Sequence, residues 1–170
     1  MNYTFTYTDE KDKSYGLSGM ALAMYAGDSC AMLRSVSLDS TDAQITFTPD
    51  FFFTASPRYS AKIAWSEMLK QYRTLNLLIV SNVLSRHILL HRQAVTSTLL
   101  DEMLGLVRDE GRDECQLDDD EIQRVFDKAC YDMRNLLSNP KVAEIMGRMA
   151  SLLCEKRALS GSEISELIER

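Results

Sequence analysis

Long apolar runs are missing from this sequence. Its most apolar stretch, residues 75–90, is interrupted by polar side chains, and the longest clean apolar run there has four residues. A transmembrane helix needs about 20 predominantly apolar residues, so we predict no membrane span. The first ten residues contain no basic region followed by an apolar run, so we expect no secretory signal peptide.

Closely spaced cysteines and the glycine motifs of common enzymes are also missing. The four cysteines are scattered and form no CxxC pair; they are Cys30, Cys115, Cys130 and Cys154. This pattern is typical of buried thiols in a reducing compartment, so we predict a cytoplasmic protein. The segment around Gly16 and Gly19 contains no GxGxxG, GK[ST] or GxSxG motif. Phosphate-cradling loops and esterase nucleophiles therefore lack their signatures. We predict no cofactor and favour a non-enzymatic protein, while an enzyme stays open as the alternative.

The composition is that of an ordinary globular protein, with 45% hydrophobic and 26% charged residues in a chain of 170. A chain of this length can bury one core without disulfide or metal support. We predict a single domain, residues 1–170. Within it, residues 1–56 form a mixed strand and short-helix segment packed on a helical bundle of residues 57–170.

The N-terminal part carries mixed local signals. Residues 2–8 alternate aromatic and threonine side chains, and this period of two predicts a strand. A polar turn is expected over residues 9–14. Residues 18–26 fit either a strand or a short helix closed by Gly27, and the pattern leaves the two alternatives open.

A hairpin is predicted after this ambiguous segment. Residues 33–38 and 44–48 favour strands, and the polar residues between them favour a loop. Pro49 is expected to end the second strand.

From residue 57 onward, cap signals and helical spacing predict about five helices. Ser56 before Pro57 is typical of a helix start, and no Gly or Pro interrupts residues 58–92. One helix over 57–91, or two with a break near Arg73, both fit. Further starts are predicted at Thr98 (with its end at Gly111), Asp118 with Glu121, Asn139 with Pro140, and Ser160 with Glu163. We therefore predict a mainly α fold, a helical bundle with a small N-terminal β-containing segment, while an α+β arrangement stays open.

His87 and His91 are the only histidines and lie four residues apart on a predicted helix. This spacing lets two imidazoles share one metal ion, although a third ligand is needed. The segment HILLH lacks the glutamate that follows the first histidine in HExxH, so a zinc-protease mechanism has no general base. We favour a place at the rim of the core for both side chains and keep a metal or ligand site as the alternative.

Charge is unevenly distributed along the chain, whose net charge is −6. Residues 57–98 carry six basic side chains and one acidic one, whereas residues 99–139 carry five basic and twelve acidic ones. The acidic residues between 109 and 121 do not have the spacing of an EF-hand loop, so they predict a solvated face. The overall negative charge also disfavours nucleic acid as a partner.

These features lead to two hypotheses about function. The first is a non-enzymatic protein-interaction or regulatory protein that binds a protein partner or self-associates through helical surfaces, because amphipathic helices carry adjacent blocks of opposite charge. The alternative is a small-molecule or metal-binding protein, which would include an enzyme, that uses His87 and His91.

Overall fold

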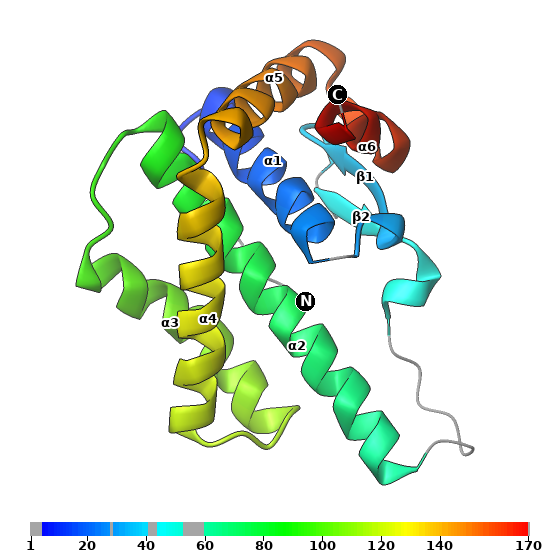
Figure 1. The fold of residues 1–170 in the computed structure, drawn as a ribbon, viewed down its shortest axis with the longest axis vertical. Helices are drawn as coiled ribbons and strands as arrows, with labels where there is room; N and C mark the ends of the chain where they lie inside the picture. Colours follow the sequence, from blue (N-terminus) through cyan, green and yellow to red (C-terminus); the bar gives the residue numbers. More distant parts are fainter. Residues whose placement is uncertain (1–4, 28, 41–43, 53–59, 170) are drawn as a thin grey trace.

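The computed structural model describes residues 5–27, 29–40, 44–52 and 60–169. These residues form six α-helices and three short strands, which confirms the mainly α prediction (Figure 1). The helices are α1 (Glu10–Ala26), α2 (Ala61–Leu84), α3 (Ser97–Asp113), α4 (Asp119–Leu137), α5 (Pro140–Lys156) and α6 (Gly161–Glu169). The strands are β1 (Leu33–Ser37), β2 (Ile45–Phe47) and β3 (Ala158–Ser160). None of the helices described is long and apolar enough to cross a membrane.

Helix α1 begins much earlier than the sequence pattern predicts. Asp9 caps it by accepting a 2.7 Å hydrogen bond from the backbone N–H of Asp12, so the turn predicted over 9–14 is wrong. The strand predicted over 2–8 is not formed by residues 5–8, and residues 2–4 lie outside the described part. A side-chain cap satisfies an otherwise unpaired helix N–H, and here it outweighs the weak strand preference of alternating side chains. The helix ends at Gly27, as one of the two alternatives predicted.

Helix α1 lies inside the fold, between α2, α5 and the sheet (Figure 1). Its middle approaches α2 closely, because a Cβ on Gly19 would stand 2.3 Å from the Ser85 hydroxyl and 2.6 Å from the Ser81 carbonyl oxygen. Small residues therefore set the spacing of the two central helices. Their contact also buries several polar side chains, namely Asp12, Ser14, Ser18, Asn76, Ser81, Asn82 and Ser85.

Helix α2 is one continuous helix and has no break at Arg73. It begins at Ala61 with Ser60 as its N-cap; the start predicted at Ser56 and Pro57 falls outside the described residues. The helix continues as a π-helical segment, η3 (Ser85–Leu90). Each π-helical turn contains about one residue more than an α-helical turn. This widening determines where the histidines and Arg86 lie.

The predicted hairpin is confirmed: β1 and β2 pair antiparallel, and a short 3₁₀ turn, η2 (Pro49–Phe51), follows β2. The sequence analysis missed the third strand. β3 pairs antiparallel with the other edge of β1, with Leu159 opposite Val36. The N-terminal sheet is thus completed by the C-terminal part of the chain, and α6 follows directly.

The later helix starts agree with the cap signals in most cases. Both capping boxes form, Asp118 with Glu121 and Ser160 with Glu163, and Asn139 caps α5. Helix α3 starts at Ser97 with Thr96 as cap, not at Thr98.

The end predicted for α3 at Gly111 is wrong, because the helix continues to Asp113. Gly111 is instead a packing position: a Cβ there would stand 2.6 Å from the Tyr72 hydroxyl oxygen.

Candidate functional site

The two histidines lie in or beside the π-helical segment η3, but their ring nitrogens contact different groups. The Nε2 of His87 is 2.7 Å from the carbonyl oxygen of Ala94, whereas the Nε2 of His91 is 3.2 Å from Oδ1 of Asp12. Among the described residues, no three His, Cys, Asp or Glu side chains are arranged to hold a metal ion. A metal role for the pair therefore stays a prediction, and it still needs a third ligand.

Asp12 is the centre of the polar cluster that His91 joins. Its carboxylate is fully buried and accepts 2.6 Å hydrogen bonds from both Nε and Nη2 of Arg86, and a 2.9 Å bond from the backbone N–H of Thr8. Burial alone would raise the pKa of Asp12. The hydrogen bonds from Arg86, Thr8 and His91 outweigh it and lower this pKa to about 2. Asp12 is therefore a stable anion paired with Arg86.

Tyr7 and Asn82 complete the surroundings of Arg86. The guanidinium lies over the Tyr7 ring at 4.7 Å, and the Asn82 amide donates a 3.0 Å hydrogen bond to the Tyr7 hydroxyl. Burial raises the pKa of that hydroxyl. Arg86 also donates a 2.9 Å hydrogen bond from Nη2 to the carbonyl of Thr6. The cluster therefore ties the segment before α1 to the end of α2.

The sequence analysis missed Asp12, Arg86, Tyr7 and Asn82. One signal was present: Asp9 and Asp12 have the spacing of a helix cap and its third helical residue, which would have placed Asp12 on a helix. Nothing local points to its partner, since Arg86 is 74 residues further along the chain.

The described cysteines behave as the sequence predicts for core thiols. Cys115, Cys130 and Cys154 are free; the first two are buried and the third is half-buried. Burial raises the pKa of Cys115, and raises that of Cys130 to about 11. Neither thiol is activated as a nucleophile, because nucleophilic cysteines need a lowered pKa. The side chain of Cys30 lies outside the described part.

The acidic residues predicted as a solvated face cluster where α3 ends and α4 begins. Asp119 pairs with Arg112 across an exposed 2.6 Å bridge, and Asp118 and Glu121 cap α4. Four of the other acids border a pocket beside Met68 and Tyr72; they are Asp109, Glu110, Asp113 and Glu114. This side of α2 is therefore acidic.

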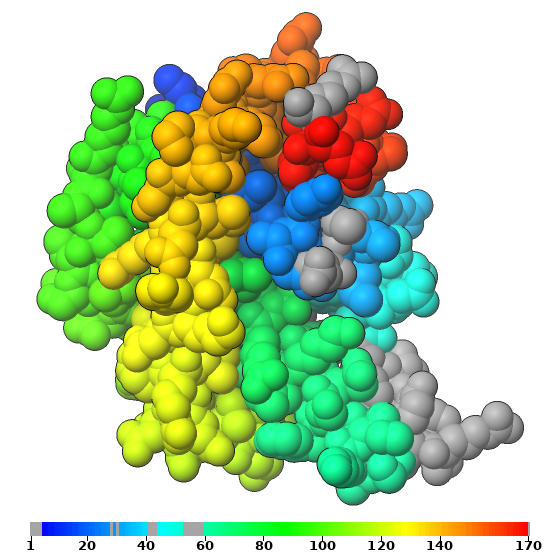
Figure 2. Space-filling model, viewed as in Figure 1, coloured from blue at the N-terminus to red at the C-terminus, as the bar shows by residue number. Residues whose placement is uncertain are grey.

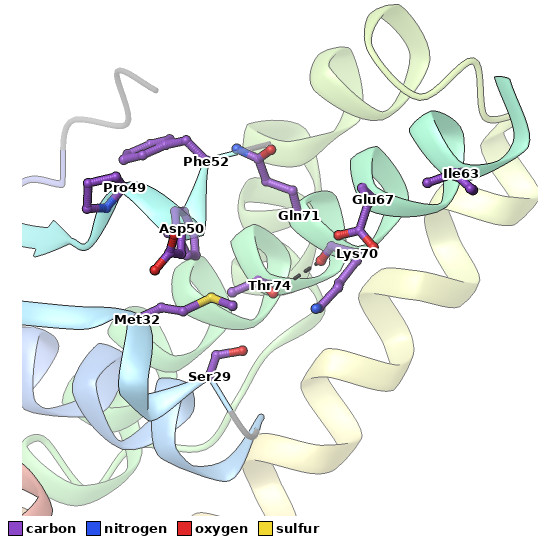
Figure 3. Close-up of a pocket in the computed structure, with 11 residues that line it drawn as sticks. Ser29, Met32, Pro49, Asp50, Phe52, Ile63, Glu67, Lys70, Gln71 and Thr74 are labelled. Atoms are coloured by element: carbon purple, nitrogen blue, oxygen red, sulfur yellow. Dashed lines mark hydrogen bonds between the residues drawn. The ribbon is translucent and has the colours of Figure 1, made fainter. Parts of the chain in front are cut away.

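A neighbouring side of α2, which shares Gln71 with that pocket, borders an open groove of about 410 Å³ below η2 (Figure 3). Phe52 and Ile63 line it and are 51% and 48% exposed. Lys70 and Glu67 extend from α2 along the same groove (Figure 3). The groove therefore combines two exposed apolar side chains with charges of both signs.

Trp65, the only tryptophan, is also exposed, at 47%, although its indole N–H donates a 3.2 Å hydrogen bond to the carbonyl of Cys115. This contact places Trp65 next to the acidic side of α2. The first turns of α2 thus expose large apolar side chains on two sides of the helix.

No family model matches the chain, and no curated protein sequence matches it significantly.

Proposed function

We propose that this chain is a non-enzymatic interaction protein that self-associates through the first turns of α2. The observation that carries the proposal is the exposure of Ile63 and Trp65 in the helix segment that extends beyond the bundle (Figure 1). Exposed aromatic and large aliphatic side chains are common at the centres of protein-protein contacts.

A second copy of this chain is the partner that we propose. The groove beside Ile63 is lined by one basic side chain, Lys70, and by the carboxylates of Asp50 and Glu67. Charge therefore does not favour this contact, and the exposed Ile63 carries it. A two-fold dimer brings the same surface of each copy together, so Ile63 of each copy meets the first turns of the other copy's α2.

The remaining features fit a binding role better than a catalytic one. The buried Asp12–Arg86 pair is saturated with hydrogen bonds, and the described thiols Cys115 and Cys130 have raised pKa values. We place this function in the cytoplasm as part of the same proposal, supported by the free cysteines.

Sedimentation velocity across the micromolar range tests the proposal. We expect a dimer that dissociates on dilution, because the contact is small and rests on a few apolar side chains. Ile63→Asp should give a monomer at all concentrations. Leu106→Asp is the matched control, since Leu106 is 44% exposed on α3 and lies outside the groove. A wild-type monomer throughout, or the same weakening from both variants, would refute self-association through this surface.

A further inference from the structure

A second pocket, of about 630 Å³, lies where α2, α4 and the end of α1 meet. These three elements adjoin on the face seen in Figure 2. Its volume is within the range of small-molecule sites, which is about 300–1,000 Å³. Its walls come from α2, from α4 and from Gly27 and Ser29, which follow α1.

The rim of this pocket is strongly basic in a protein whose net charge is −6. Four cationic side chains and a single carboxylate line it: Lys70, Arg73, Arg124, Lys128 and Asp132. Lys128 pairs with Asp132 at 2.9 Å. Lys70 and Arg73 form no ion pair with any other residue that the structure describes. Three positive charges therefore face the pocket without a neutralising partner.

The floor of the pocket is apolar. Leu77 and Val125 are only half-buried although they pack on the hydrophobic core, and Ala129 lies beside them. A ligand that covers these side chains gains hydrophobic contact, and a phosphate on the same ligand can be held by guanidinium N–H groups. Of the two arginines, Arg124 uses only its Nε within the described part of the protein, in a bond to the carbonyl of Asp120.

We propose that this pocket binds a small organic phosphate, with the phosphate on Arg73 and Arg124 and the apolar part of the ligand on Leu77 and Val125. A long nucleic acid is a poorer fit, because the acidic cluster at the start of α4 adjoins the pocket and would repel a continuing phosphate backbone. The pocket adjoins the groove beside Phe52 and shares Ser29, Lys70 and Thr74 with it, but neither arginine lines that groove.

Titration of the full chain with phenyl phosphate, followed by amide NMR shifts, tests the proposal. Inorganic phosphate and benzyl alcohol separate the charged from the apolar contribution. We expect phenyl phosphate to shift the amides of Thr74, Leu77 and Val125 and to bind at least about tenfold more tightly than either comparison compound. Equal affinity for inorganic phosphate, no saturable shifts, or shifts confined to other regions would overturn the proposal.

Charge-neutralising variants locate the site. Arg73→Gln and Arg124→Gln should each weaken phenyl phosphate binding by about tenfold or more. Arg108→Gln is the matched control, because Arg108 is exposed on α3 and does not line the pocket. Unchanged far-UV circular dichroism verifies that each variant folds. Equal weakening by the control, or none by the two pocket variants, would overturn the assignment. Self-association is measured separately with Ile63→Asp, so the two proposals fail independently.

Discussion

The guanidinium of Arg86 donates two 2.6 Å hydrogen bonds to the carboxylate of Asp12, which is fully buried. The pair joins the first turn of α1 to the π-helical end of α2, and it is the strongest polar contact between these two helices. It is enclosed by Tyr7 and Asn82, which makes it part of the core and not of the surface.

We expect Asp12→Asn to destabilise the protein by about 3 kcal/mol, because removing one partner of a buried ion pair leaves the other charge unpaired. Urea denaturation measures the loss. Asp101→Asn is the control, since Asp101 is exposed on α3, and it should change stability by less than about 0.5 kcal/mol. If Asp12→Asn also changed stability by less than about 0.5 kcal/mol, the pair would not hold the two helices together.

The stability that Asp12 contributes should depend on pH in a defined direction. Its pKa is lowered from 3.8 to about 2 in the folded protein, so the contribution is complete above pH 4 and is lost as pH falls through about 2. Urea denaturation of wild type and Asp12→Asn between pH 4 and pH 2 measures the contribution of Asp12 alone. The other carboxylates titrate in both proteins, so their effects cancel in the difference. The stability difference should shrink by about 2 kcal/mol as pH falls from 4 to 2. A constant difference would contradict the lowered pKa.

Two glycines should respond to alanine in opposite ways. A Cβ at Gly19 would stand 2.3 Å from the Ser85 hydroxyl oxygen and 2.6 Å from a backbone oxygen, so Gly19→Ala should cost about 1–3 kcal/mol through overpacking. A Cβ at Gly105 meets nothing within 4 Å, so Gly105→Ala should stabilise α3 by about 0.5–1 kcal/mol. Thermal denaturation compares them. A neutral Gly19→Ala would mean that α1 and α2 are less closely packed than described.

Cys130 should resist alkylation in the native protein. It is buried and its pKa is raised to about 11, so its thiolate fraction at neutral pH is roughly a hundredfold or more below that of an ordinary thiol. Iodoacetamide labelling followed by peptide mass spectrometry should find Cys154 modified before Cys115 and Cys130, because Cys154 is only half-buried. Unfolding in urea should remove the difference. Rapid native labelling of Cys130 would contradict its burial.

Local chemistry explains which elements could be predicted. The starts of α4, α5 and α6 follow from side chains within three residues of each helix end, so a reader of the sequence can recognise them. The same reasoning misjudged Gly111, because a glycine near a helix end is also what a close contact with Tyr72 requires. Residues 9–14 were predicted as a turn, although Asp9 has the side chain of a helix cap and α1 begins at Glu10.

The sequence by itself determined the helical character of the chain, the starts of α4, α5 and α6 and the β1–β2 hairpin, since each depends on neighbours a few residues apart. Only the tertiary structure decided the pairing of β3 with β1, the burial of Asp12 against Arg86 and the basic pocket between α2 and α4. These features join segments that are distant in the chain. Their positions follow from how the helices pack, and side-chain periodicity carries no information about the partner that a given face will meet.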